Sequence, residues 1–210
     1  MFVRELDREY PVITSARGAW LHDAGGMAYL DAVSGGAMVT SLGQGVDEII
    51  DAAGEQARSV SFLYSQQFTS PPQEALAERL VGLAPEGFGR VHFVAGGAEA
   101  NEAALRLARA YHVERGEPER WRIISPAQAY HGPTMSTLAL AGRPAMSRPF
   151  EPYLESHLHI PPATWRFDPS GARALEALDR ALEEAGPETV AAFFIEPVSA
   201  AALPAYAPPA

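Results

Sequence analysis

The 210-residue sequence predicts an α/β fold, in which a mainly parallel sheet is flanked by helices and preceded by a small N-terminal α+β segment. From residue 91 onward, short apolar segments alternate with amphipathic helical patterns, the order that parallel strands and crossover helices produce. Ahead of them, two short apolar segments flank a glycine-containing turn, which is typical of a β-hairpin. We therefore divide the chain into a leading segment, residues 1–60, and a main segment, residues 61–210.

The first part of the chain predicts a hairpin and two helices. The hairpin is expected over residues 19–32, around a turn that contains Gly25 and Gly26. A helix is expected over residues 46–60, and a second one starts at Ser70, because serine is a good N-cap and the prolines after it are tolerated in a first turn. The apolar face of the first helix consists of Val46, Ile49, Ile50 and Ala53, and the expected buried stripe of the second consists of Leu76, Leu80 and Leu83.

The rest of the chain predicts alternating strands and helices. Strands are expected over residues 91–94, 121–125 and 191–195, and helices over residues 98–115 and 170–185. Residues 143–169 are rich in proline and too long for an ordinary connection, so we interpret them as an active-site or interface loop.

The charge and the apolar pattern exclude several classes of partner. The formal net charge is -10 and the isoelectric point is near 5.0, and an acidic surface repels nucleic acid and anionic membranes. The N-terminus carries charges where a signal peptide needs an apolar stretch, and the apolar residues 190–210 are interrupted by Glu196 and by prolines. We expect a cytoplasmic protein that binds neither nucleic acid nor a membrane.

Two residue types are missing from the sequence. It contains no lysine, so the 16 basic residues are all arginine, and it contains no cysteine. A Walker-type phosphate loop and a Schiff-base enzyme both need a lysine, and neither can be completed within these residues. Thiolate nucleophiles, disulfides and cysteine metal sites are excluded as well.

A glycine pair marks the first candidate site. The expected strand at residues 91–94 is followed by Gly96 and Gly97, and a helix begins at once. The unpaired N–H groups and the positive dipole end of such a helix start favour an anion, typically phosphate, which glycines allow to approach closely. An ordinary strand-to-helix turn is the alternative, and the dinucleotide pattern of three spaced glycines is not met.

Two further polar motifs follow expected strands. Tyr130-His131-Gly132 comes after the second strand, and an aromatic ring and an imidazole there could cover a flat ring. Glu196 lies just past the third strand, so all three motifs are expected at one rim of the sheet. His157 and His159 could share one face of a strand, but no third ligand is evident and we expect no metal site.

The order and spacing of these motifs resembles class III aminotransferases, which are pyridoxal-phosphate enzymes of fold type I. The matching segments are Tyr29-Leu30-Asp31, Leu42-Gly43-Gln44-Gly45, Gln56, Gly96 to Glu102, Ala104 to Arg109, Tyr130-His131-Gly132 and Glu196-Pro197-Val198. The resemblance implies that residues 61–210 form the first part of the fold type I large domain, which binds the cofactor, and that residues 1–60 belong to the small domain with its leading helix.

Roles follow from the resemblance residue by residue. The backbone amides of Gly97 and Ala98 are expected to bind the phosphate of pyridoxal 5'-phosphate, Tyr130 to stack on its ring beside His131, and Glu196 to lie near the polar edge of the ring. The chain departs from the family pattern at three places. Gln44 replaces a histidine, Gly97-Ala98 replaces a serine-containing pair, and Ser199 stands where glutamine or valine is frequent.

The family continues after Glu-Pro-Val to an aspartate that pairs with the ring nitrogen and to the Schiff-base lysine, and these 210 residues include neither segment. We expect the N-terminal half of an aminotransferase, with a second polypeptide that carries both residues and an isolated chain that is inactive. The completed particle is expected to be an oligomer, at least a dimer of two-chain units, that takes an amino donor and a keto or aldehyde acceptor.

Several alternatives stay open at this point. A truncated chain or a gene fragment accounts for the same resemblance, and related members of the family catalyse isomerisations instead of transamination. A non-catalytic binding or regulatory module that retains the scaffold is the alternative from another class of function. The donor and the acceptor cannot be read from these residues.

Overall fold

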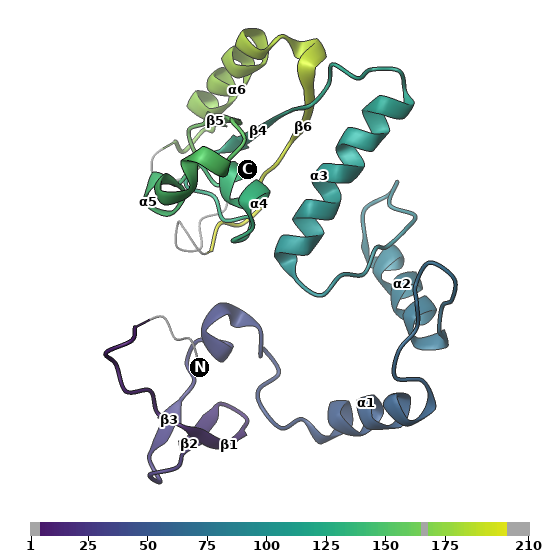
Figure 1. Ribbon diagram of the computed structural model, residues 1–210, viewed down its shortest axis with the longest axis vertical. Helices are drawn as coiled ribbons and strands as arrows, with labels where there is room; N and C mark the ends of the chain where they lie inside the picture. Colours follow the sequence, from purple (N-terminus) through teal and green to yellow (C-terminus); the bar gives the residue numbers. More distant parts are fainter. Residues whose placement is uncertain (1–4, 165–167, 201–210) are drawn as a thin grey trace. The chain divides into compact units, whose positions relative to one another are not determined.

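The computed structural model describes residues 5–164 and 168–200 (Figure 1). The chain divides into two compact units, residues 1–89 and residues 90–210, and each is described by itself. The predicted boundary between residues 60 and 61 concerns the domains of a complete aminotransferase fold, so it stays a prediction.

The first unit begins with a three-stranded antiparallel sheet. The elements of the whole unit are β1 (Ile13–Arg17), β2 (Trp20–Asp23), β3 (Ala28–Leu30), the short π-helical turn η1 (Ser34–Met38), α1 (Asp47–Ser59) and α2 (Pro71–Leu83). The predicted hairpin is confirmed as β2 and β3, whose turn is held by the Asp23 carboxylate, which accepts from the N–H groups of Gly25 and Met27 at 2.9 and 2.8 Å. The strand β1 was not predicted, and it pairs with the edge of β2 that does not face β3.

The two predicted helices of this unit are confirmed, but the predicted burial of Leu76, Leu80 and Leu83 in the second helix is wrong. No residue of α1 or α2 is buried, and Ile50 and Leu83 remain 57% and 75% exposed. An amphipathic pattern fixes which side of a helix is apolar, but burial also needs a second surface against that side. Within the described part of residues 1–89, no element supplies that surface.

The second unit is built on a parallel sheet with the strand order β5-β4-β6. Its elements are α3 (Gly97–Glu114), β4 (Arg122–Pro126), α4 (Met135–Leu140), α5 (Pro144–Ser147), the 3-10 turn η2 (Arg148–Tyr153), β5 (Leu158–Ile160), α6 (Ala172–Ala185), the 3-10 turn η3 (Pro187–Thr189) and β6 (Val190–Phe193). The predicted α/β class is therefore confirmed. Across the described ranges of both units, no helix is long and apolar enough to span a lipid bilayer.

Two predictions for this unit are wrong. Residues 91–94 are extended but form no strand, because none of the described residues pairs with their backbone. The stretch of residues 143–169, expected to be an irregular loop, contains α5, η2 and β5. A three-residue strand followed by two prolines has too few residues to show an alternating pattern, and only its pairing with β4 identifies it.

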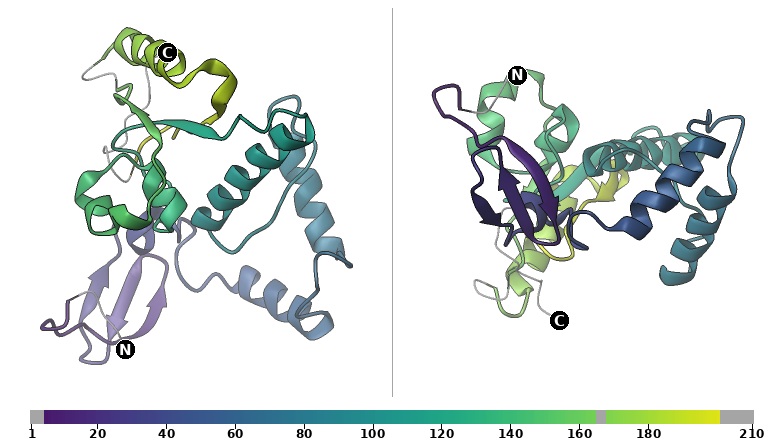
Figure 2. Two further views of the ribbon diagram at one scale, coloured as in Figure 1. Left: turned by 45° about the horizontal axis from the view of Figure 1, so that its top comes forward. Right: turned by 90° about the horizontal axis from the view of Figure 1, so that it is seen from below.

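Neighbouring residues of β4 show how the layers are stacked. Ile124 packs with Ile160, Ala177 and Ala181 in the core between the sheet and α6. Ile123 lines the opposite side together with residues of α3, since successive side chains of a strand point to opposite faces. The sheet therefore lies between α6 and α3, as the two views in Figure 2 also indicate.

Candidate functional site

Two of the three predicted motifs meet beyond the carboxyl ends of β4 and β6. The backbone N–H of Tyr130 donates to Oε2 of Glu196 at 2.9 Å. The hydroxyl of Ser199 donates to the same oxygen at 3.2 Å. One carboxylate oxygen thus fixes the backbone at Tyr130, which places the two motifs at one rim, as the strand order requires.

The third motif joins them through α3. Asn101 donates from Nδ2 to the carbonyl oxygen of His131 at 2.7 Å, and the hydroxyl of Thr134 donates to Oε1 of Glu102 at 2.6 Å. These two residues of α3 therefore hold the 130–134 segment against the helix.

Gly132 makes the closest approach between this segment and α3. Its φ is +130°, and a Cβ atom at this position would lie 2.6 Å from Cβ of Ala98 and 2.9 Å from Oγ1 of Thr137. Only glycine avoids both the backbone strain and the overlap. The Tyr-His-Gly motif therefore ends in glycine because the start of α3 packs directly against it.

The start of α3 is open to an anion. Gly96 is the N-cap and has no side chain to cap the helix, so the N–H groups of Gly97 and Ala98 have no acceptor within the helix. A Cβ atom on Gly96 or Gly97 would meet no other heavy atom within 4 Å. The Glu99 carboxylate accepts from the N–H of Ala95 at 2.8 Å, which orders the turn ahead of the helix. Exposed amides at the positive dipole end suit a phosphate group.

Tyr130 and His131 face different surroundings. Tyr130 is 41% exposed, whereas His131 is 6% exposed and its ring stands edge-on to Phe194, with the centroids 6.1 Å apart. Burial lowers the pKa of His131 below its usual 6.5, His159 lowers it further, and the charge of Glu196 opposes the change. His131 is therefore neutral at pH 7, and its buried Nε2 has no hydrogen-bond partner among the described residues. The exposed ring available to a flat ligand is that of Tyr130.

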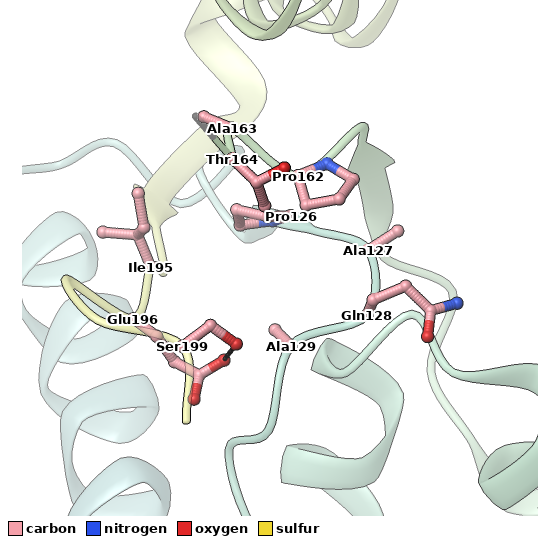
Figure 3. A pocket seen from close by; sticks show the side chains of 10 residues that line it. All are labelled: Pro126, Ala127, Gln128, Ala129, Pro162, Ala163, Thr164, Ile195, Glu196 and Ser199. Carbon is pink, nitrogen blue, oxygen red and sulfur yellow. Dashed lines mark hydrogen bonds between the residues drawn. The ribbon is translucent and has the colours of Figure 1, made fainter. Parts of the chain in front are cut away.

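A small pocket adjoins the site (Figure 3). Its lining consists of Pro126, Ala127, Gln128, Ala129, Pro162, Ala163, Thr164, Ile195, Glu196 and Ser199. Its volume of about 30 Å³ suits a water molecule and is too small for an aromatic ring. An aromatic ring therefore does not fit inside this pocket.

The described part of the chain contains no cluster of metal-ligating side chains. No cluster of three or more histidine, cysteine, aspartate or glutamate side chains in residues 5–164 and 168–200 is arranged to hold a metal ion. The sequence as a whole also offers no lysine amine. The groups that meet at the rim include backbone amides, an aromatic ring and a carboxylate, and no nucleophilic amine.

Together, a helix start with open amides, an exposed aromatic ring and a carboxylate at the rim of a parallel sheet define an α/β protein with groups that suit a phosphorylated ring. The model of the aminotransferase class-III family matches residues 3–207, and the chain belongs to this family. The predicted family resemblance is thus confirmed. Class III aminotransferases use pyridoxal phosphate as their cofactor.

Known proteins resemble the chain over nearly all of its length. A probable aminotransferase of Mycobacterium tuberculosis is 37% identical over 208 residues, which cover 96% of this chain and 44% of that protein. An (S)-enantioselective omega-transaminase of Thermomicrobium roseum has a TM-score of 0.86 and 35% identity, covering 95% of this chain and 46% of that one. An omega-transaminase of Pseudomonas jessenii in complex with PMP has a TM-score of 0.87 and 28% identity, with coverage of 95% and 46%. The chain therefore spans about half the length of these relatives.

Asn101 and Glu102 belong to the segment that resembles the family, but no contact of either residue was predicted from the sequence. Their spacing from Ala98 puts all three residues on one face of a helix, since residues three and four apart are neighbours. That spacing indicates that the three residues could contact one neighbouring segment. The partners of this face, His131 and Thr134, lie some thirty residues away in sequence, and only the folded chain shows the contacts.

Proposed function

We propose that this chain supplies the phosphate and ring platform of a pyridoxal-phosphate-dependent aminotransferase. Gly97 and Ala98 bind the phosphate through their amides, Tyr130 stacks on the ring beside His131, and Glu196 lies near the ring's polar edge. The observation that carries the proposal is the pair of contacts that joins the three motifs, Tyr130 to Glu196 and Gly132 to Ala98.

The residues present fit the cofactor. The open amides at the start of α3 offer a cradle that side chains do not fill, and the exposed ring of Tyr130 offers a flat face. Bound pyridoxal phosphate supplies an electron sink for carbanion chemistry at the substrate. The amides neutralise the phosphate charge, the stacked tyrosine excludes water from one face of the ring, and Glu196 keeps the tyrosine backbone in place.

We further propose that the aspartate for the ring nitrogen and the cofactor-binding lysine are carried by a second polypeptide. The 210 residues contain no lysine and span about half the length of the relatives, so in this proposal both groups come from residues outside the given sequence. In this proposal the isolated chain is inactive, the particle is at least a dimer of two-chain units in the cytoplasm, and its substrates are an amino donor and a keto or aldehyde acceptor. Residues 1–60 contribute to the small domain and residues 61–210 to the large domain.

Co-expression with the polypeptide encoded beside this one tests the proposal. The expected result is a stable complex that retains pyridoxal phosphate, seen as visible absorbance after gel filtration, and that transfers an amino group from an amine to pyruvate. Each chain expressed alone is expected to lack transfer activity. A longer form of this same chain that carries the lysine and is active alone would contradict the two-chain division and leave the cofactor assignment standing.

The isolated chain provides a second readout. If it is a regulatory module, it stays monomeric and soluble for days and gains no activity from any second-half polypeptide. If it is part of the enzyme, the second half stabilises it and raises its affinity for the cofactor. Failure to bind pyridoxal phosphate in either state would contradict the proposed function.

A further inference from the structure

Asn101 stands at a position that helix formation does not explain. It lies in the second turn of α3, where asparagine is a poorer helix former than alanine because its side chain competes for backbone hydrogen bonds. Its amide nitrogen instead donates across to the carbonyl oxygen of His131 at 2.7 Å, and the side chain is half-buried. The residue therefore serves a contact between α3 and the 130–134 segment.

This contact joins the two elements that make up the proposed cofactor site. The helix carries the open amides of Gly97 and Ala98, and the segment next to it carries the exposed ring of Tyr130. The backbone that carries the ring is held at Tyr130 by Glu196 and at His131 by Asn101. Removal of the Asn101 hydrogen bond weakens the link between the ring and the helix.

We propose that Asn101 is a positioning residue that sets the place of the Tyr130 ring relative to the amides at the start of α3. The inference rests on the proposed function. A phosphorylated pyridine is one rigid ligand, so its phosphate and its ring bind together only if the two sites keep a fixed separation. Asn101 maintains that separation by tying the peptide next to Tyr130 to the helix that carries the amides.

The chemistry of the side chain decides which substitutions are informative. Asn101→Ala removes the donor and raises the helix propensity of α3, so a loss of affinity cannot come from a weaker helix. Asn101→Asp keeps the shape but turns an acceptor toward the carbonyl oxygen of His131, which repels it. Arg106→Ala is the matched control, because Arg106 is exposed on the same helix and has no hydrogen bond in the described structure.

A double-mutant cycle with Tyr130→Ala separates positioning from local stability. Dissociation constants of pyridoxal phosphate and of inorganic phosphate are measured by fluorescence titration of the full chain in complex with its second-half partner. Asn101→Ala is expected to weaken pyridoxal-phosphate binding about five- to tenfold, the effect of one lost hydrogen bond, and to leave inorganic phosphate unchanged. In the Tyr130→Ala background the same change is expected to cost less than about twofold, because no ring remains to be positioned.

The outcomes distinguish this inference from the proposed function. Equal losses in both backgrounds would mean that Asn101 acts on local stability alone and would overturn the inference, as would no loss in either. A wild-type complex that binds inorganic phosphate but not pyridoxal phosphate would overturn the proposed function itself. Arg106→Ala is expected to match the wild type with both ligands.

Discussion

The N–H of Tyr130 and the carboxylate of Glu196 lie 2.9 Å apart although 66 positions separate the two residues. The contact joins the loop after β4 to the loop after β6, neighbouring strands of the parallel sheet. The helix α3 holds the same segment through Asn101. The ring of Tyr130 is therefore carried by a backbone that is fixed from two elements of the fold.

Substitution of Glu196 should separate geometry from charge at this contact. Glu196→Ala leaves the N–H of Tyr130 without its acceptor, and the expected cost is about tenfold in the dissociation constant of pyridoxal phosphate, the value of one hydrogen bond to a charged group. Glu196→Gln keeps an acceptor oxygen and should retain most of the affinity. Equal losses in the two variants, measured by fluorescence titration, would assign the effect to charge and not to the backbone contact.

Gly132→Ala should destabilise the second unit more than an ordinary glycine substitution. The new Cβ would overlap Ala98 at 2.6 Å in a positive-φ position, so we expect a loss of about 2–4 kcal/mol from strain and overpacking together. Gly116→Ala is the control, because Gly116 has a positive φ but open space around it, and about 1 kcal/mol is expected. Urea denaturation measures both, and similar losses would mean that the Ala98 contact is not tight.

The sequence predicted the helices and strands that have a local residue pattern, and it missed the short strands that are defined only by pairing with another strand. Glycine-bounded amphipathic segments identified α3 and α6, but the three-residue β5 is defined only by its pairing with β4. At the site, the rule for parallel strands brought Tyr130 and Glu196 to one rim, whereas Gly97 follows residues that form no strand and is joined to that rim through α3. It could not show the contact from Asn101 to His131, because a hydrogen bond between distant residues leaves no periodic pattern.

Gly97→Leu should weaken cofactor binding without loss of fold. Space around Gly97 is open, so the side chain fits, but it stands in front of the amides and blocks the approach of phosphate. We expect the dissociation constant of pyridoxal phosphate to rise by about tenfold or more, roughly 1.4 kcal/mol, while thermal unfolding is unchanged. Ala98→Leu is a poorer test, because Ala98 packs against Gly132 and a larger side chain would displace it.

The buried histidines should make the chain less stable in mild acid. Burial lowers the pKa of both His131 and His157, so below pH 6.5 the unfolded chain takes up protons that the folded chain does not. Because the unfolded state then binds more protons, the free energy of unfolding falls as the pH falls, by at most about 1.4 kcal/mol per pH unit for each group. His131→Gln should reduce this dependence between pH 7.5 and 5.5, as measured by urea denaturation at each pH. A dependence that is unchanged in His131→Gln would contradict this prediction.

In the proposed enzyme, this chain holds the phosphate and the ring while another polypeptide supplies the lysine. The only primary amine of these 210 residues is the α-amino group of Met1, since the sequence contains no lysine. Borohydride reduction in the presence of pyridoxal phosphate, followed by peptide mapping in a mass spectrometer, measures where the cofactor becomes attached. We predict at most a trace on the terminal amine of the isolated chain, and one adduct per complex on a lysine of the second polypeptide. A stoichiometric adduct on the isolated chain, together with aminotransferase turnover, would contradict the account.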